Sequence, residues 1–339
     1  MRVVHTILAA IVAAGLTFAA AVGVRAEPLK LHQGWVVAGA DAPLLMFDNP
    51  GGIAKHQGAS YALDAIHFSG TPPMITALGA GEIELAALAY SSFALAVQNA
   101  GMSNLRIVAD VFQDGVPGYY TNEYMVLKDG PVKTVEDLKG KVAAANVAGS
   151  AVDMALRAML KKHGLEDKKN ITIVEVGFPN MRATLADHKV DIISSVRPFS
   201  ADPALLQIAR PLFTQKEAIG QSQMIILVAS DSFLQKNRKA VVDYLEDSLR
   251  ALAWWTDPAN HDKVVNIIAT FAKQPPANYA SWFFTKGGDF YHDPKGLPNL
   301  DALQSNVDLQ QELGFLKAKL DVKKYADLSL VQEAAGRIK

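Results

Sequence analysis

The sequence of 339 residues contains no cysteine. The chain therefore has no disulfide, no thiolate for nucleophilic catalysis or metal binding, and no cysteine to carry the lipid of a lipoprotein. The motifs G-x-S-x-G and H-E-x-x-H and the phosphate-binding P-loop are also missing. The eight histidines are scattered, with none spaced i,i+4 as in a helical metal site. We therefore expect no enzyme, no metal site and no cofactor.

A large charge of either sign is absent as well. The chain has 33 Lys and Arg against 34 Asp and Glu, a net charge of −1. This balance offers no basic surface for nucleic acid, so we expect no nucleic-acid partner. Hydrophobic residues make up 50% of the chain, which at this length is enough for two packed cores.

The first 26 residues have the composition of a secretory signal. Arg2 precedes an apolar stretch rich in Ala and Val, and the small residues Val24 and Ala26 stand just before Glu27. No basic cluster follows that would retain the segment as a membrane anchor. We expect cleavage near Ala26, which would change the net charge from −1 to −3 by removing two arginines. A freely diffusing periplasmic protein is the simplest interpretation.

Strand-like and helix-like segments alternate twice along the chain. One series runs from Leu29 to Phe112 and another from Tyr124 to Ser230, whereas the segment after Ser230 is mostly helical. This pattern predicts an α/β protein with a mainly parallel sheet in each lobe, and a helical C-terminal region that packs on lobe 1. The predicted division is 1–26 signal peptide, 27–122 first part of lobe 1, 123–229 lobe 2 and 230–339 completion of lobe 1. The hinge would lie at the two crossings, near 118–122 and near Ser230.

The two series match each other when one is shifted by 107 positions. The pairs are Gly70 with Gly177, Pro72 with Pro179, Met74 with Met181, and Leu78 with Leu185. The tripeptide Val-Ala-Gly also recurs, at 37–39 and 147–149. Duplication of a β-α-β unit and convergence on one turn chemistry both account for this match. Either origin places the same backbone features at the same points in both lobes.

Strand-to-helix turns are the expected ligand positions, because ligands of open α/β sheets bind outside the carboxyl ends of the strands. Four such turns occur, at 39–42, 69–71, 90–92 and 149–151. Helix N-termini favour oxyanions. A serine or glycine there is also an ordinary helix cap, but four turns in two similar lobes favour a shared cleft. A long helix is predicted to begin directly after Gly149-Ser150.

Three large side chains at strand ends are further candidates. Arg197 follows an apolar strand, and its guanidinium could grip a carboxylate or sulfonate or could simply lie on the surface. Tyr90 is its equivalent in the first series and could add a hydrogen bond or a ring face. Trp35 would be a pocket wall if the cleft exists. Four residues near the proposed hinge, Tyr119, Tyr120, Glu123 and Tyr124, could line the cleft or simply pack.

Several segments carry a family resemblance. They are Lys128-Asp129 with Pro131, "TVEDLKGK", the turn "AGSAVD", "VGF", "VDIISS" and, in the first series, "ALGAGEIELAAL". With these the chain resembles the periplasmic solute-binding proteins of ABC importers in the sulfonate/nitrate/taurine class. The resemblance implies a two-lobed type II periplasmic binding protein without a cofactor, which closes on a small anionic solute and delivers it to a permease in the inner membrane. We expect a monomer.

The resemblance also implies binding positions. They are the turn at 39–42 with Gly39, Ala40 and Asp41, then Ser69, Gly70 and Thr71, then Tyr90 and Ser91, and finally Asn146 with Gly149, Ser150 and Ala151. Relatives often carry Trp-x-Pro where this chain has Val196-Arg197-Pro198, so sulfonate specificity does not carry over automatically.

Two alternatives stay open. The same fold serves a pyrimidine-forming enzyme of thiamine biosynthesis, but that enzyme relies on a cysteine-rich motif that is absent here. A ligand sensor that docks on a membrane receptor would use the same two-lobed clamp as an importer.

Overall fold

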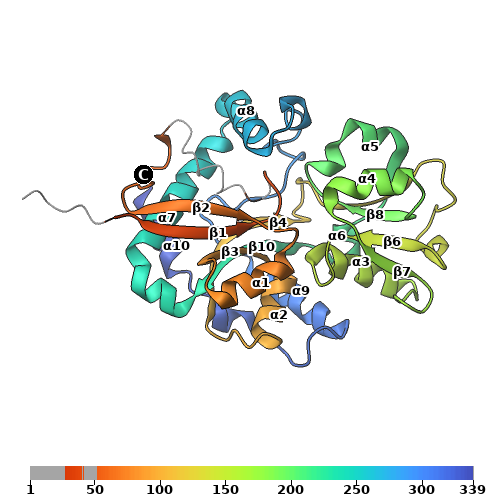
Figure 1. Ribbon diagram of the computed structural model, residues 1–339, viewed down its shortest axis with the longest axis horizontal. Coiled ribbons are helices and arrows are strands. Elements are labelled where there is room, and N and C mark those ends of the chain that lie inside the picture. The colour runs from red at the N-terminus through yellow and green to blue at the C-terminus, as the bar shows by residue number, and fades with distance from the viewer. Residues whose placement is uncertain (1–26, 40, 42–51, 339) are drawn as a thin grey trace, which may run out of the picture.

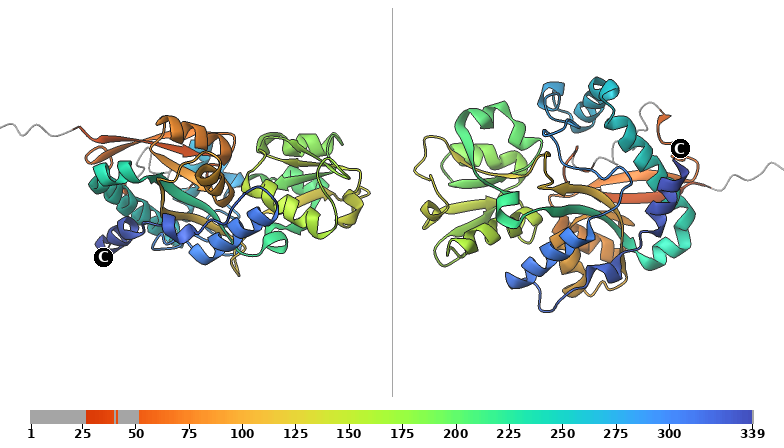
Figure 2. Two further views of the ribbon diagram at one scale, coloured as in Figure 1. Left: turned by 90° about the horizontal axis from the view of Figure 1, so that it is seen from below. Right: turned by 180° about the vertical axis from the view of Figure 1, so that it is seen from behind.

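The computed structural model describes residues 27–39, 41 and 52–338, which form two α/β lobes side by side (Figures 1 and 2). The expected signal peptide at 1–26 and the turn residues Ala40 and Ala42 lie outside the described residues. None of the helices in the described ranges has both the length and the hydrophobicity needed to cross a membrane.

The sheet of the first lobe has the order β2-β1-β3-β10-β4. Its strands are β1 (Leu29–Trp35), β2 (Tyr61–His67), β3 (Leu85–Ala89), β4 (Leu105–Asp114) and β10 (Ser222–Ser230). β1 pairs in parallel with β2 and β3, whereas β10 is antiparallel to both β3 and β4. Helices α1 (Thr71–Ala80) and α2 (Tyr90–Gln98) connect the strands.

The sheet of the second lobe has the corresponding order, β7-β6-β8-β5-β9. Its strands are β5 (Glu123–Leu127), β6 (Val142–Ala145), β7 (Thr172–Glu175), β8 (Ile192–Ser195) and β9 (Ala209–Thr214). β6 is parallel to β7 and β8, and β5 is antiparallel to β8 and β9. The helices are α3 (Ala151–Lys162), α4 (Phe178–Ala186), α5 (Pro203–Ile208) and α6 (Gln215–Ile219). In each sheet, four strands share one direction and a single strand opposes them.

The sequence match at a shift of 107 corresponds to equivalent helices. Gly70 is the N-cap of α1 and Gly177 is the N-cap of α4, and each helix has proline in its first turn. Met74 of α1 and Met181 of α4 are both buried. The two Val-Ala-Gly turns also agree, because Gly39 and Gly149 both adopt positive φ, 98° and 80°, which glycine tolerates best.

The strand at 222–230 corrects the expected course of the chain. The sequence interpretation assigned this segment to lobe 2, up to residue 229, but β10 pairs with β3 and β4 of the first sheet. The chain therefore returns to lobe 1 between β9 and β10, before residue 222. Each lobe takes its antiparallel strand from the crossing region, β5 just after the first crossing and β10 just after the second. A strand flanked by helices looks the same in sequence whichever sheet it joins.

The C-terminal region packs on the first lobe (Figures 1 and 2). Its helices are α7 (Asp231–Trp255), α8 (His261–Ala272), α9 (Leu300–Glu312) and α10 (Ser329–Arg337). α7 lies against β2 and β10, α9 against β10 and α2, and α10 against α7 and β4. Hydrophobic side chains join the lobes: one continuous core cluster contains Phe112 of β4 and Phe178 of α4.

Candidate functional site

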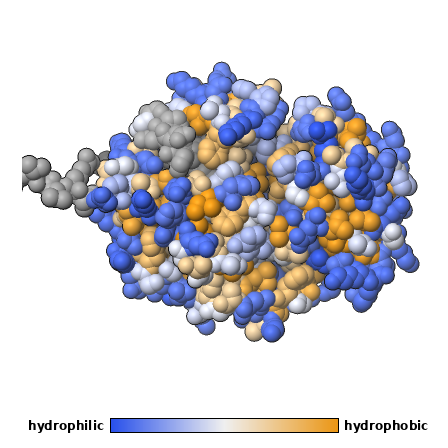
Figure 3. All heavy atoms as spheres, in the orientation of Figure 1, coloured by the Kyte–Doolittle hydropathy of each residue, from blue (hydrophilic) through white to orange (hydrophobic). Residues whose placement is uncertain are grey.

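A pocket with an empty volume of about 530 Å³, part of it open to solvent, lies between the lobes. Most of its walls are apolar. The first lobe supplies Val36, Val37, Ala89, Phe112, Met224, Ile225 and Phe290, and the second supplies Ala151, Val152, Phe178 and Val196. Figure 3 shows a mostly hydrophilic outline, with hydrophobic patches on the faces of both lobes.

Six polar residues interrupt the apolar walls: Asp41, Thr71, Asn122, Asn146, Ser150 and Arg197. Five of them were expected from the sequence, and Ala151, also expected, lines the pocket beside Ser150. The structure therefore brings together candidates from both lobes.

The start of α3 is the most organised part of the pocket. Ser150 is the N-cap, and its hydroxyl accepts a hydrogen bond from the Asp153 amide at 3.3 Å and donates one to Asn146 Oδ1 at 2.7 Å. The long helix thus begins where the sequence predicted. The first-turn amides of Ala151 and Val152 have no partner within the helix, because the first four amides of any helix lack one. This end of α3 is suited to an anion.

Arg197 lines the pocket but also joins the lobes. Its Nε donates to the carbonyl of Gly288 at 3.0 Å, in the C-terminal region, and its Nη1 donates to Ser200 Oγ at 3.0 Å. The guanidinium carbon lies 3.9 Å from the ring centroid of Tyr120 and 5.4 Å from that of Trp282. The arginine is therefore held in one position by contacts with both lobes, and these contacts use part of its donor capacity.

The Asp41 side chain is hydrogen-bonded to backbone amides that follow the end of β1. Its carboxylate accepts hydrogen bonds from the amides of Val36, at 2.9 Å, and Val37, at 3.1 Å. Burial raises the pKa of this carboxyl from 3.8 to about 6, although the two amide hydrogen bonds oppose the shift. The sequence suggested the turn at 39–42 for a ligand anion, but the amides just before that turn are already bound by the protein's own carboxylate.

Three other candidates mark where the lobes touch. The Tyr90 hydroxyl donates to the carbonyl of Ala151 at 3.3 Å, and the carbonyl of Ser69 accepts from Asn146 Nδ2 at 3.4 Å. A β-carbon on Gly70 would lie 2.8 Å from Cγ2 of Val147. These residues therefore hold the lobes together, and they are not among the residues that line the pocket.

The remaining candidates lie elsewhere. Trp35 packs against His67 and Phe271, with ring centroids 4.6 and 5.3 Å away, and Gly39 adjoins Phe283. Ser91 is fully buried in lobe 1, and the Gly149 amide donates to Asp153 Oδ2 at 2.9 Å. The pocket instead includes residues that sequence reasoning missed, namely Phe112, Asn122, Phe178, Met224 and Phe290. The only sequence signal for any of them was the position of Asn122 at the proposed hinge.

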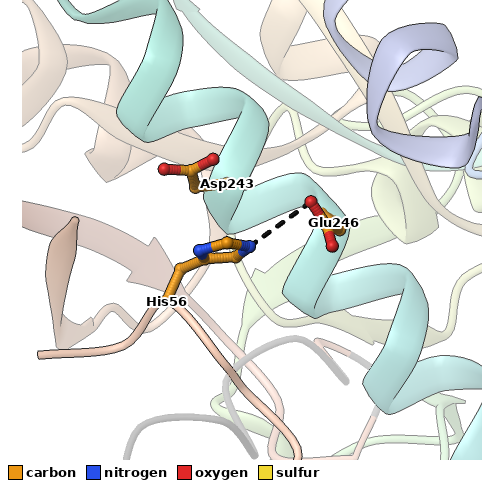
Figure 4. Close-up of side chains that lie close together, drawn as sticks. All are labelled: His56, Asp243 and Glu246. Atoms are coloured by element: carbon orange, nitrogen blue, oxygen red, sulfur yellow. Dashed lines mark ion pairs between the residues drawn. The ribbon is translucent and has the colours of Figure 1, made fainter. Parts of the chain in front are cut away.

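A cluster of His56, Asp243 and Glu246 has the ligand types of a metal site (Figure 4). His56 Nε2 lies 3.3 Å from Glu246 Oε2. Cations already surround the carboxylates, however. Asp243 is 2.6 Å from Lys239 Nζ and 2.9 Å from Arg337 Nη1, and Glu246 is 2.6 Å from Arg250 Nη2. We interpret this cluster as an ion-pair network that fixes the segment at 55–61 to α7.

The two equivalent sheets, each with one antiparallel strand, and the pocket between them define the fold of a two-lobed type II periplasmic binding protein. The model of the NMT1-like family matches residues 25–269, and the chain belongs to this family. The resemblance found in the sequence is thereby confirmed at the level of family and fold. No curated protein matches the sequence.

Solved structures share the fold at low sequence identity. The periplasmic aliphatic sulphonate binding protein SsuA from Escherichia coli has a TM-score of 0.67 and 21% identity, over 88% of this chain and 97% of that chain. The periplasmic nitrate-binding protein NrtA from Synechocystis PCC 6803 has a TM-score of 0.70 and 16% identity, over 92% and 89%. The desulfurization enzyme DszB has a TM-score of 0.65 and 13% identity, over 92% and 100%. The fold thus serves both binding proteins and an enzyme.

Proposed function

We propose that this protein is a periplasmic substrate-binding protein that captures a small organic anion between its lobes and delivers it to an ABC permease in the inner membrane. The observation that carries the proposal is the pocket itself, whose lining comes from both lobes and includes the start of α3 and Arg197. The sulfonate- and nitrate-binding proteins of the same fold support this class of solute.

The anionic group of the solute would lie at the second lobe. The amides of Ala151 and Val152 begin α3 there, and Arg197 supplies the positive charge. The first-lobe turn is a poorer place for it, since Asp41 accepts hydrogen bonds from the amides of Val36 and Val37. A second carboxylate beside Asp41 would also be repelled while Asp41 is charged.

A thermal-shift screen of the purified protein tests the proposal. Organic carboxylates, organic sulfonates, nitrate and pyrimidines are compared at equal concentration and ionic strength. We expect at least one organic anion to raise Tm, because a ligand that binds only the folded state stabilises it. Stabilisation by pyrimidines alone, or by no solute in the screen, would contradict the proposal.

The similarity to DszB gives an enzyme of the same fold as the second candidate. Incubating any stabilising solute with the protein and analysing the mixture by mass spectrometry separates the two functions. A binding protein returns the solute unchanged, whereas an enzyme converts it. A ligand sensor would also return the solute unchanged, so co-purification with a permease or with a receptor decides between import and sensing.

A further inference from the structure

Asn122 has a buried oxygen that no described residue satisfies. The residue is 1% exposed, and its Oδ1 has no hydrogen-bond donor among the described residues. Buried polar atoms are almost always hydrogen-bonded, and an unpaired one carries the full cost of its lost hydration. This oxygen belongs to a residue that lines the pocket between the lobes.

The orientation of the Asn122 amide is fixed by its neighbours. Its Nδ2 donates to Gln215 Oε1 at 3.3 Å, while Gln215 Nε2 contacts Ser222 Oγ at 3.1 Å and Met224 Sδ at 3.2 Å. Because a thioether sulfur cannot donate, the Met224 contact fixes which end of the Gln215 amide is the nitrogen. Turning the Asn122 amide over would bring two oxygens together. The backbone is fixed too, because the Asn122 amide donates to Asp114 Oδ2 at 2.8 Å and its carbonyl accepts from the Gln215 amide at 2.8 Å. The unpaired atom is therefore an acceptor that cannot turn away.

The surroundings of Asn122 in the pocket are apolar and partly aromatic. Phe112, Phe290 and Met224 line the same pocket, and the rings of Phe112 and Phe290 lie 4.4 Å apart. Such walls suit a flat apolar body, and they offer Asn122 Oδ1 no donor. The missing donor would then have to come from the ligand or from a water molecule.

We propose that the ligand is an aromatic organic acid that also carries a hydroxyl or N–H donor, and that Asn122 selects it by accepting that hydrogen bond. The proposal rests on the function given above, since the acidic group would lie at the start of α3 and Arg197. It adds that the ligand has an aromatic ring and a hydrogen-bond donor, and that Asn122 accepts the hydrogen bond from this donor.

Matched ligand pairs test the selection. Isothermal titration calorimetry compares para-hydroxybenzoate with para-methoxybenzoate, and para-hydroxybenzenesulfonate with para-methoxybenzenesulfonate. Each methoxy compound keeps the ring, the acid and the oxygen but lacks the donor. We expect the hydroxy member of at least one pair to bind the wild type about tenfold more tightly, as one buried hydrogen bond would give.

Three variants assign the preference to Asn122. Asn122→Leu should lose the preference, whereas Asn122→Asp, which keeps an acceptor, should retain it while binding all four acids more weakly. Ile225→Ala alters the pocket wall but leaves the acceptor Asn122 in place. It should therefore weaken the binding of both members of a pair alike. If Asn122→Leu does not fold, Asn122→Ser, whose shorter side chain withdraws the acceptor, replaces it and should reduce the preference.

The failures are distinguishable. Equal binding of both members of each pair by the wild type would mean that water satisfies Asn122, and it would overturn this inference alone. Binding of aliphatic acids but of none of these aromatic acids would overturn it as well and leave the proposed function standing. Absence of binding by any organic anion would overturn both.

Discussion

Gly70 of lobe 1 leaves just enough room for Val147 of lobe 2, because a β-carbon on Gly70 would lie 2.8 Å from Val147 Cγ2. Gly70 has extended backbone, with φ of −175°, so its importance lies in this contact and not in backbone conformation. The two residues belong to turns that follow strands in different lobes. The lobes therefore meet in close contact at these two turns, next to Thr71 and Asn146 of the pocket.

Gly70→Ala should hinder closure of the lobes. The added methyl group forces Val147 or the whole turn to move, an overpacking that costs about 1–3 kcal/mol. We expect anion affinity to fall about fivefold or more and the radius of gyration of the liganded protein to increase. Calorimetry and small-angle X-ray scattering measure these effects. The double variant Gly70→Ala, Val147→Ala should recover most of the affinity, and failure to recover it would show that the contact does not limit closure.

Arg197→Lys should weaken binding although the positive charge is kept. Lysine lacks the planar fork that reaches the Gly288 carbonyl and Ser200 Oγ and stacks on Tyr120. We expect a lower Tm and a loss of anion affinity of about tenfold.

The matched control for this substitution is Arg210→Lys. Arg210 donates to the Val132 carbonyl at 2.8 Å and is not among the residues lining the pocket. It should lower Tm without changing affinity. Unchanged affinity in Arg197→Lys would remove the guanidinium from the ligand site.

Ser150→Ala should reduce both stability and affinity. It removes the cap of α3, which costs about 1 kcal/mol in typical proteins, and it frees Asn146 Oδ1 from its hydrogen bond. Ser230→Ala is the matched control, because Ser230 caps α7 with a hydrogen bond of the same 3.3 Å length. Thermal melts should show similar losses of stability. Calorimetry should show weaker anion binding for Ser150→Ala alone. Equal anion affinities of Ser150→Ala and Ser230→Ala would argue against a ligand at α3.

The protein should become more stable as the pH falls from 7.5 to 5.5. Burial raises the pKa of four carboxyls from 3.8, to about 6 for Asp41 and to about 7 for Asp110, Asp114 and Asp289. Between pH 4 and 7 the folded state therefore holds protons that the unfolded chain releases. Stability then declines as the pH rises through the folded pKa values. Thermal melts across this range check the direction, and a Tm that rises with pH would contradict it.

Asp114→Asn should flatten this pH dependence. An amide at this position can donate to Thr121 Oγ1 and accept from the Asn122 amide, which are the two partners of the carboxyl. The decline of the unfolding free energy with rising pH should become less steep, by up to about 1.4 kcal/mol per pH unit. The exposed Asp187→Asn serves as the control and should leave the slope unchanged. An unaltered slope in Asp114→Asn would show that this carboxyl does not hold a proton in the folded state.

The sequence predicted the features that arise from local backbone chemistry. The turn predicted at 69–71 does lead into α1, and α3 begins directly after Gly149-Ser150 as predicted. What it missed depends on contacts between distant segments. Phe112 and Phe290 are 178 positions apart in the sequence, yet they share one wall of the pocket. Asp41 has the same sequence signature whether it binds a ligand or, as here, accepts hydrogen bonds from Val36 and Val37.

Calorimetric titration of the purified protein with organic carboxylates and sulfonates tests the central claim most directly. The account predicts that at least one such anion binds with one-to-one stoichiometry, is recovered unchanged, and binds more weakly to Ser150→Ala and Arg197→Lys than to their matched controls. The absence of binding by any of these anions, or binding that neither variant weakens, would contradict it.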